Sequence, residues 1–340
     1  MRILVLGGTR FLGRHFVDAA LAAGHAVTIF TRGKLPAPWG HRVEARVGDR
    51  DPFREPGLAT LDAGTWDAVV DTSGYVPRVV GAGADRLAGR VGRYLFVSSL
   101  SVYAEPSRAG LDENAPVAVL GDPDTEDVLP NYGALKAACE AAVTARFGLS
   151  TTLVRPGLIV GPLDATDRFG YWVARFRAPH LLGERGPVAV VPGPPERPIQ
   201  VIDARDLALF MLALLESDRG GTFNACSDAG HWTFRDMVDA LKSGGPPGPT
   251  PRWIDDATLL GHGVEPWTGL PLWIPQNDPE SAGFMSFDCR RALDAGLAPR
   301  PLTATVDDTL AWLLRRDNAG AWKLVLGGER EREIVAATEG

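Results

Sequence analysis

The sequence contains little cysteine and no pattern of cysteine or histidine that would bind a metal ion. Its three cysteines, Cys139, Cys226 and Cys289, are odd in number and lie far apart. They match neither a disulfide framework nor a zinc motif, and this usage suits a reducing, cytoplasmic environment. The six histidines show no ligand spacing. We therefore expect a cytoplasmic protein without a metal site.

An excess of positive charge and a long hydrophobic run are also missing. The formal net charge is −7 over 340 residues, which argues against nucleic acid as a general partner. The longest strongly apolar run, Leu207 to Leu215, is far too short to cross a membrane, and the first residues lack the features of a signal peptide. With 45% hydrophobic and 23% charged residues, the composition is that of an ordinary soluble globular protein.

The first thirty residues have the pattern of a strand, a glycine turn, a helix and a second strand. The apolar run from Arg2 to Leu6 is typical of a buried parallel strand, and it leads into Gly7-Gly8-Thr9-Arg10-Phe11-Leu12-Gly13. A helical pattern follows and stops near Gly24, before a second apolar run from Ala26 to Phe30. Backbone N–H groups and the helix dipole at such a turn favour a pyrophosphate. The alternative is a plain turn between a strand and a helix.

The residues after the second strand indicate which dinucleotide binds. An acid there accepts hydrogen bonds from the adenosine ribose of NAD, whereas an arginine pairs with the 2′-phosphate of NADP. This sequence has Thr31-Arg32-Gly33-Lys34 with no acid, and Arg10 lies in the glycine turn. Because arginine binds phosphate with two parallel hydrogen bonds, we predict NADP(H) over NAD(H). The alternative, that Arg32 and Lys34 are solvated surface charges, stays open.

Tyr132 and Lys136 are four residues apart, which places them on one face of a predicted helix. A neighbouring ammonium favours phenolate over phenol, so the tyrosine can donate and accept a proton near neutral pH. Before them in the chain, an apolar run from Arg93 to Val97 ends in Ser98-Ser99. Ligands of doubly wound sheets bind at the carboxyl ends of strands, so a serine there can hydrogen-bond a substrate oxygen. The alternatives are an exposed helix face and a turn capped by serines.

Together these segments resemble an extended short-chain dehydrogenase/reductase of the NAD-dependent epimerase/dehydratase family, from Met1 to about Asp317. The resemblance also includes Gly48-Asp49, Val102-Tyr103, Arg155-Pro156-Gly157 and the stretch from Val201 to Ala208. It implies an α/β fold, a Rossmann-type doubly wound parallel sheet with a smaller C-terminal substrate lobe. It also implies three catalytic residues: Ser99 orients the substrate oxygen, Tyr132 is the acid/base, and Lys136 holds the nicotinamide ribose and lowers the pKa of Tyr132.

The resemblance further implies a cofactor site along the carboxyl ends of the strands, with Asp49 near the adenine. The residues expected to bind the cofactor are Gly7, Gly8, Thr9, Arg10, Phe11, Leu12, Gly13, Thr31, Arg32, Asp49, Arg50, Thr72, Ser73, Gly74, Ser98, Tyr132, Lys136, Pro156 and Gly157. The residues expected to contact the substrate are Ser99, Tyr75, Arg168, Tyr171 and Arg197.

Three departures from the family pattern bear on the substrate. The middle glycine of the family's turn is Arg10 here, as in a subgroup that includes proteins resembling plastid RNA-binding relatives. The acid after the second strand is missing. Nucleotide-sugar members hold the diphosphate with one arginine that Arg197 matches and another late in the chain, where this sequence has Asp278-Pro279-Glu280. Because acids repel a diphosphate, the resemblance covers the fold and the cofactor class better than the substrate class.

Alternating strand and helix patterns predict how the chain is divided. The predicted parts are 1–156 with 198–226 for the dinucleotide-binding domain, 157–197 and 227–317 for the substrate lobe, and 318–340 for a C-terminal tail, either a charged helix or a frayed end. Residues 104–130 form a long acidic insertion that we expect to cross the top of the sheet as a lid. The aromatic-rich segments of the lobe either line an apolar pocket or form its core.

The sequence thus predicts an NADP(H)-dependent oxidoreductase that transfers hydride reversibly to a carbonyl or hydroxyl carbon of a small molecule, with Tyr132 as acid/base. One alternative is an NAD-dependent sugar or sugar-nucleotide epimerase or dehydratase that regenerates its cofactor in each cycle. A second is a non-catalytic protein that binds a dinucleotide or RNA. A homodimer formed through the helix of Tyr132 and Lys136 fits the resemblance.

Overall fold

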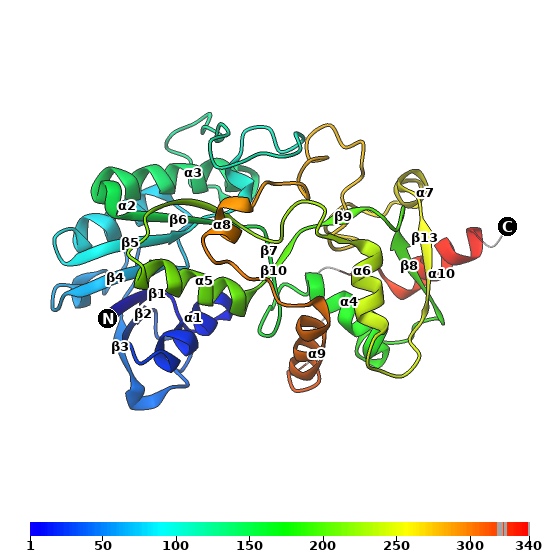
Figure 1. The fold of residues 1–340 in the computed structure, drawn as a ribbon, viewed down its shortest axis with the longest axis horizontal. Helices are drawn as coiled ribbons and strands as arrows, with labels where there is room; N and C mark the ends of the chain where they lie inside the picture. The colour runs from blue at the N-terminus through cyan, green and yellow to red at the C-terminus, as the bar shows by residue number, and fades with distance from the viewer. Residues whose placement is uncertain (318–321, 323–324, 339–340) are drawn as a thin grey trace.

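The computed structural model describes residues 1–317, 322 and 325–338, and its larger part is a seven-stranded parallel sheet (Figure 1). The strand order is β11-β6-β5-β4-β1-β2-β3. The strands are β1 (Arg2–Leu6), β2 (Ala26–Thr31), β3 (Val43–Val47), β4 (Trp66–Asp71), β5 (Val91–Val97), β6 (Thr151–Pro156) and β11 (Gly221–Ala225). The chain winds outward from β1 in one direction and then from β4 in the other, so the predicted Rossmann-type doubly wound sheet is confirmed.

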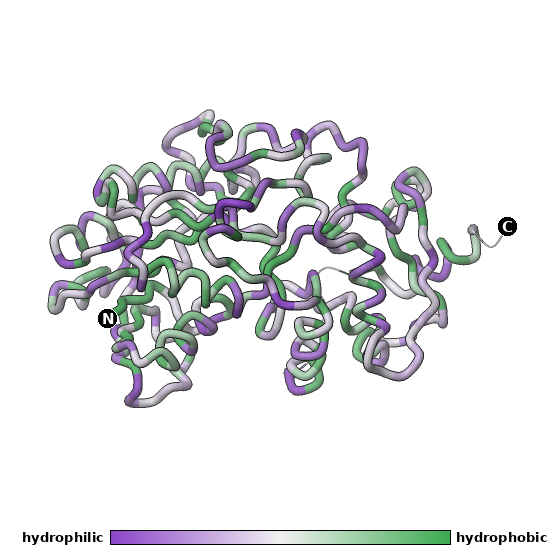
Figure 2. The backbone as a smooth tube through the Cα atoms, viewed as in Figure 1, coloured by the Kyte–Doolittle hydropathy of each residue, from purple (hydrophilic) through white to green (hydrophobic). Residues whose placement is uncertain are grey.

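Helices cover both faces of this sheet. One face carries α1 (Phe11–Ala22) and α5 (Ala204–Glu216), and the other carries α2 (Pro77–Leu87) and α3 (Val128–Phe147) (Figure 1). Side chains of a strand point alternately to the two faces, and β1 shows the consequence: Ile3 and Val5 pack with α1 and α5, whereas Leu4 and Leu6 pack with α2 and α3. Strand β1 is therefore hydrophobic on both sides, and Figure 2 gives the hydropathy of each residue along the sheet.

The C-terminal lobe has a hydrophobic core of its own, centred on α4 (Arg168–Arg177), α6 (Phe234–Lys242) and α9 (Leu302–Leu313). It lies at the opposite end of the molecule from the N-terminus (Figure 1). Its other elements are β8 (Val188–Pro192), β9 (Pro198–Ile199), β12 (Trp232–Thr233), β13 (Thr250–Ile254), α7 (Asp256–Gly261) and α10 (Gly328–Ala337). Between the two parts lie β7 (Leu158–Val160) and β10 (Val201–Asp203), and α8 (Arg290–Asp294) packs against the edge strand β11.

Single turns of 3-10 helix complete the secondary structure. They are η1 (Gly40–Arg42), η2 (Ala59–Leu61), η3 (Leu100–Val102), η4 (Gly148–Ser150) and η5 (Pro179–Leu182). No helix in the described ranges combines the length and the apolar character needed to cross a membrane.

The segment expected to return to the main sheet does so only in part. Strand β11 pairs with β6 and forms an edge of the seven-stranded sheet. Strand β10 instead pairs with β7 in a separate two-stranded sheet. The expectation that residues 200–203 rejoin the main sheet is therefore wrong, because β6 already receives β11 on its open side.

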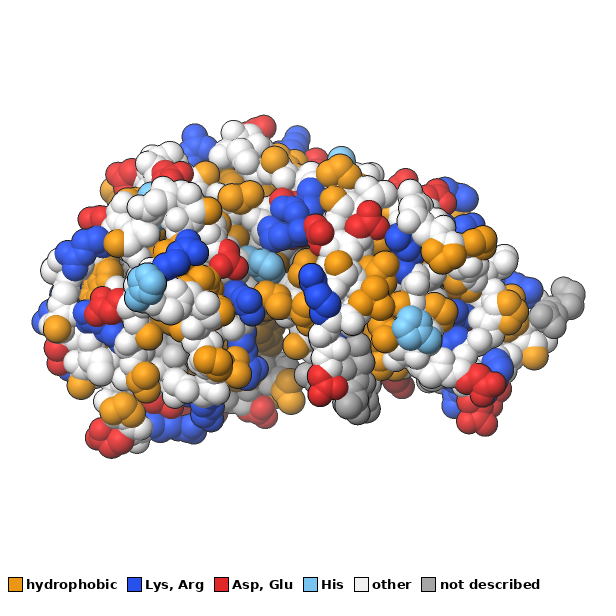
Figure 3. Space-filling model, turned by 90° about the horizontal axis from the view of Figure 1, so that it is seen from below, with side chains coloured by type: hydrophobic (Ala, Val, Ile, Leu, Met, Phe, Trp, Pro, Cys, Tyr) orange, Lys and Arg blue, Asp and Glu red, His pale blue; other side chains and the backbone are white. Residues whose placement is uncertain are grey.

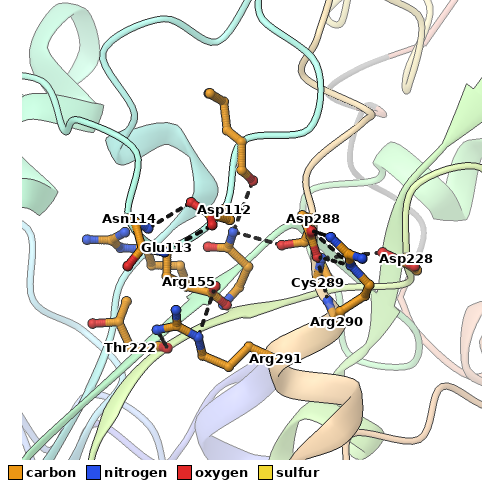
Figure 4. A network of polar contacts seen from close by, with 12 residues as sticks. Asp112, Glu113, Asn114, Arg155, Thr222, Asp228, Asp288, Cys289, Arg290 and Arg291 are labelled. Atoms are coloured by element: carbon orange, nitrogen blue, oxygen red, sulfur yellow. Dashed lines mark hydrogen bonds and ion pairs between the residues drawn. The ribbon is translucent and has the colours of Figure 1, made fainter.

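The insertion expected to act as a lid is tied to the molecule in its middle. Gly110 donates its N–H to Ser286, and Leu111 accepts from the N–H of Asp288. Glu113 accepts the N–H of Asn224 on β11 and pairs with Arg291 (Figure 4). These bonds attach residues 110–113 to both the edge strand and α8, so this part of the insertion is an anchored cover and not a free lid.

The predicted C-terminal tail contains the docked helix α10. Residues 318–321, 323–324 and 339–340 of that tail lie outside the described residues. Within α10, Glu331 is 2% exposed and accepts from the Nε of Arg175 at 3.0 and 3.1 Å. A buried ion pair thus fixes the helix to the lobe, in place of the frayed end that was one of the two expectations.

Candidate functional site

A cleft of about 1210 Å³ runs along the carboxyl ends of the parallel strands and reaches the C-terminal lobe. Figure 3 shows the molecule hollowed between its two parts. The cleft is lined by most of the residues that the sequence indicated for a cofactor: Gly7, Gly8, Thr9, Arg10, Phe11, Leu12, Gly13, Thr31, Arg32, Asp49, Arg50, Thr72, Ser73, Ser98, Tyr132, Lys136, Pro156 and Gly157. Ser99, Tyr75 and Arg168 line it as well.

The glycine turn brings backbone close to the floor of the cleft. Gly7 has φ +112°, and a Cβ there would lie 2.6 Å from the Oγ1 of Thr72. A Cβ at Gly13 would lie 2.8 Å from the nitrogen of Gly8. Helix α1 then begins with no side-chain cap and no acid in its first turn. Its first N–H groups are therefore available to an anion such as a pyrophosphate, and the missing side chains of Gly7 and Gly13 let the turn and the helix pack closely.

Three cations stand at the mouth of this turn. Arg10, Arg32 and Lys34 are exposed and line the cleft, and no ion pair with another described residue engages them. Arg50 differs, because its guanidinium makes two bonds to the buried carboxylate of Asp71, at 2.7 and 2.5 Å. The charge of Arg50 is thus committed within the protein, whereas the other three are free to meet a phosphate.

Tyr132 lies in the first turns of α3, where Asn131 interrupts the helical backbone with φ −114° and ψ 17°. Gly133 lets this end of the helix touch the loop after β5, since a Cβ there would collide with the carbonyl oxygen of Ser101. In that loop, Ser99 caps η3 by accepting the N–H of Ser101 at 3.1 Å. The tyrosine and the serine therefore meet at one point of the cleft wall.

Lys136 is held by the main chain and not by Tyr132. Its Nζ donates to the carbonyl oxygens of Gly74 at 2.7 Å and Val97 at 2.6 Å. Burial raises the pKa of Tyr132, and the Ser99 hydroxyl acts in the opposite direction. The expectation that Lys136 lowers the pKa of Tyr132 is thus not what the structure shows: the ammonium is committed to two carbonyls, and burial dominates at the phenol.

The buried lysine makes stability depend on pH. Burial lowers the pKa of Lys136 from 10.5 to about 8. Between these values the unfolded chain binds a proton that the folded chain lacks, so the free energy of unfolding rises with pH in this window. Below pH 8 both states hold the proton, and the full cost of burying the ammonium is present. The rise should reach at most about 3 kcal/mol.

We therefore expect Lys136→Met to remove this rise in the protein without dinucleotide. Urea unfolding of wild type and variant between pH 7.5 and 10 gives the difference in free energy, and the other titrating groups cancel because both proteins contain them. Lys242→Met, at an exposed site on α6, should follow wild type. Parallel curves for wild type and Lys136→Met would contradict the assignment.

At the C-terminal end, the cleft is bounded by residues of the lobe. Arg168, Trp267, Thr268 and Phe284 line it there. Tyr171 does not: it is fully buried in the core of the lobe on α4.

Arg197 is also away from the cleft wall. It is 4% exposed, and its guanidinium donates to Ile274 O at 2.6 Å, to Gly193 O and to Asp256. The structure therefore places both Tyr171 and Arg197 outside the surface that a substrate in the cleft would meet.

Some residues shape the site in ways that the sequence did not show. Gly74 lies under the wall, where its carbonyl holds Lys136. Ser98 is 3% exposed, and its Oγ is buried without a hydrogen-bond partner although the residue lines the cleft. Thr166, Trp267 and Phe284 reach the cleft from loops far along the chain, and a hydroxyl or an aromatic ring in a loop carries no periodic signal. In the described ranges, no group of three or more His, Cys, Asp or Glu is placed to hold a metal ion.

Comparison with known proteins identifies relatives. The model of the NAD dependent epimerase/dehydratase family matches residues 3–226. Among curated proteins, the chain is similar to the chloroplast stem-loop binding protein of 41 kDa b of Arabidopsis thaliana, at 27% identity over 264 residues. That match covers 73% of this chain and 64% of the relative, which is less than two thirds of the relative's length.

Solved structures share the fold over nearly the whole chain. A nucleoside-diphosphate-sugar epimerase from Pseudomonas aeruginosa is 22% identical, with a TM-score of 0.65 over 94% of this chain and 99% of that one. UDP-glucuronic acid 4-epimerase from Bacillus cereus, in complex with NAD, is 15% identical, with a TM-score of 0.65 over 95% and 100%. A human epimerase family protein with NADPH is 21% identical, with a TM-score of 0.56 over 92% and 99%.

These identities are low, so the solved structures show the common fold alone, and both NAD and NADPH occur among them. The family match is stronger evidence, because it extends over most of the chain and includes the glycine turn, Ser99, Tyr132 and Lys136. The chain belongs to the NAD dependent epimerase/dehydratase family of enzymes.

Proposed function

We propose that the protein is a nicotinamide-dependent epimerase or dehydratase that acts on a small sugar-like substrate and regenerates its cofactor in each cycle. The observation that carries the proposal is that the glycine turn and the pair of Ser99 and Tyr132 line one continuous cleft. The family match favours this alternative over a net NADP(H)-dependent oxidoreductase.

The residues of the chain would bind and position, while a bound nicotinamide dinucleotide supplies the acceptor and donor of hydride. The turn from Gly7 to Gly13 would hold the pyrophosphate. Lys136 and Ser98 would face the nicotinamide half, where the unpartnered Oγ of Ser98 has a hydrogen bond to make. Ser99 and Tyr132 would hold the substrate hydroxyl, and Tyr132 would accept its proton and later return it.

The experiment is to incubate the protein with NAD+ or NADP+ and a set of simple sugars and sugar acids, and to follow two signals. Nuclear magnetic resonance reports a new epimer or dehydration product, and absorbance reports reduced nicotinamide. Product without accumulation of reduced nicotinamide supports the proposal. Reduced nicotinamide in equal amount to an oxidised product overturns it in favour of a net oxidoreductase.

The free cations at the glycine turn favour one specific cofactor within this proposal. Arg10, Arg32 and Lys34 have no acidic partner among the described residues, and two of them are arginines, which suit a 2′-phosphate. We expect the nucleotide-stripped protein to bind NADP+ at least tenfold more tightly than NAD+, which corresponds to about 1.4 kcal/mol. Titration calorimetry measures both constants.

The variant Arg32→Ala should weaken NADP+ by about tenfold, the same loss of about 1.4 kcal/mol, and leave NAD+ nearly unchanged. Arg42→Ala is the matched control, because Arg42 is exposed and lies outside the cleft lining. Equal binding of the two dinucleotides by wild type, or an equal loss for both in Arg32→Ala, would show that these arginines are surface charges.

RNA binding, suggested by the name of the Arabidopsis thaliana relative, finds less support in this chain. The net charge is −7, and acidic and basic side chains are interspersed over the face drawn in Figure 3. A protein that binds RNA through its phosphates gathers basic residues on one surface. The cleft is therefore the better guide to function.

A further inference from the structure

We propose that Arg168 and Trp267 form a subsite for a single anionic group, a carboxylate or a phosphate, carried by the substrate. This inference rests on the proposed function, since it concerns the same cleft. It names the substrate class as sugar acids or sugar phosphates.

Arg168 is a cation in the cleft that no carboxylate of the described residues pairs with directly. It is the first residue of α4, lines the cleft and is partly buried. Its Nε donates to the Oγ1 of Thr166 at 3.0 Å, and no ion pair with another described residue engages the guanidinium. Burial lowers the pKa of Arg168, which reflects the cost of holding the charge away from water, and the nearby carboxylate of Asp164 offsets this cost only in part. An anion on a ligand would offset that cost.

The loop before α4 holds the guanidinium in place. Asp164 is 3% exposed and accepts both the N–H of Thr166 at 2.9 Å and its hydroxyl at 2.6 Å. Thr166 therefore receives the Nε of Arg168 with its remaining acceptor capacity. The two terminal nitrogens of Arg168 stay available, and they form the fork that binds a carboxylate or a phosphate with two parallel bonds.

Trp267 supplies a flat apolar surface beside this fork. The guanidinium carbon of Arg168 lies 5.7 Å from the centre of the Trp267 ring, and Phe284 supports that ring edge-on at 5.9 Å. The backbone of Trp267 has φ +63°, a conformation that is rare for a bulky residue and that clusters at ligand sites. Ring and cation together match a sugar ring whose substituent is negatively charged.

A nucleotide diphosphate fits this end of the cleft less well. Arg197, which the sequence placed as the diphosphate residue, donates to Gly193 and Ile274 and pairs with Asp256. Its N–H groups are thus directed into the protein. Arg168 alone can bind one anionic group, and this favours a small substrate with a single carboxylate or phosphate.

Calorimetry on the full chain, saturated with whichever of NAD+ and NADP+ binds more tightly, tests the inference with three probes. These are D-glucuronate, D-glucose 6-phosphate and the neutral D-glucose. We expect at least one anionic sugar to bind tenfold or more tightly than D-glucose, and the better of the two tells a carboxylate site from a phosphate site. Equal or undetectable binding of all three overturns the inference.

Arg168→Gln should remove the preference for the anion, and Arg168→Lys should keep part of it, since lysine retains the charge without the fork. Arg235→Gln is the matched control, because Arg235 is an exposed arginine on α6 that pairs with Glu196 and lies outside the cleft lining. Unchanged dinucleotide affinity in Arg168→Gln verifies its folding. A preference for the anion that survives in this variant overturns the inference.

Tyr132→Phe separates this inference from the proposed function. The variant should lose one hydrogen bond to every sugar but keep the preference for the anionic sugar over D-glucose, because Arg168 is untouched. If wild type binds an anionic sugar but turns over no sugar, the anion subsite is supported and the proposed function is contradicted. If wild type turns over neutral sugars and shows no preference for an anion, the proposed function is supported and the anion subsite is contradicted.

Discussion

Replacing Tyr132 with phenylalanine is expected to lower kcat by about a thousandfold and to leave the dissociation constant of the dinucleotide within about twofold of wild type. General acid–base catalysis by a positioned side chain contributes about 10² to 10⁴ in rate, and the substitution removes only the phenolic oxygen. The ring, which lies 6.4 Å from that of Tyr75, keeps its packing. Cofactor affinity should persist because the glycine turn is untouched.

Tyr75→Phe is the matched control for this prediction. Tyr75 lines the same cleft, is 48% exposed and also loses a single hydroxyl. We expect kcat to fall by less than tenfold in this variant, which corresponds to a loss of transition-state stabilisation below about 1.4 kcal/mol. Single-turnover measurements with saturating dinucleotide separate the chemical step from product release. Full activity of Tyr132→Phe would show that the proton moves through another group.

The parts of the fold that local patterns describe could be predicted from the sequence. The apolar run before Gly7 is short and has no helical period, which predicts a buried strand and not a helix. Strand β1 spans Arg2–Leu6 as expected. The stop near Gly24 is likewise local, since this residue has φ +81° directly after α1. Alternation of such segments sufficed for the doubly wound sheet.

Partners that lie far along the chain could not be predicted. Arg197 has the character of a ligand-binding residue in the sequence, yet Asp256 pairs with it from 59 positions away. Lys136 is one turn from Tyr132, but Gly74 in the loop after β4 and Val97 at the end of β5 provide the carbonyls that hold its ammonium. Spacing on a helix specifies which residues share a face, whereas it does not specify what the fold places opposite that face.

The lobe gives the same lesson for a single helix. Arg168 and Tyr171 are three residues apart on α4, and both were expected to contact the substrate. The structure places Tyr171 in the hydrophobic core and leaves Arg168 at the cleft. Because α4 is packed against both α6 and α9, only its first turn reaches the cleft, and no hydrophobic period in the sequence marks that turn.

Replacing Glu331 with alanine is expected to lower the free energy of unfolding by about 3 to 5 kcal/mol, the range for breaking a buried ion pair by removing one partner. Glu331 accepts from Arg175 at 3.0 Å, from Arg185 at 3.3 Å and from the N–H of Val190 at 3.2 Å. Alanine would leave the guanidinium of Arg175, which is 1% exposed, without its countercharge. The loss should appear as an earlier midpoint in urea unfolding followed by fluorescence.

The same helix offers a control two residues away. Glu333 pairs with Arg330 at 3.2 Å, but both side chains are about half exposed, and surface pairs contribute about 0 to 1 kcal/mol. Glu333→Ala should therefore change stability little. An equal, small effect of both substitutions would mean that α10 is not fixed by Glu331. A large effect of Glu331→Ala alone would show that the carboxylate of Glu331 stabilises the lobe that bounds the cleft, because it joins α10 to Arg175 on α4 and to Val190 on β8. Glu331 lies outside the segment that the family model matches.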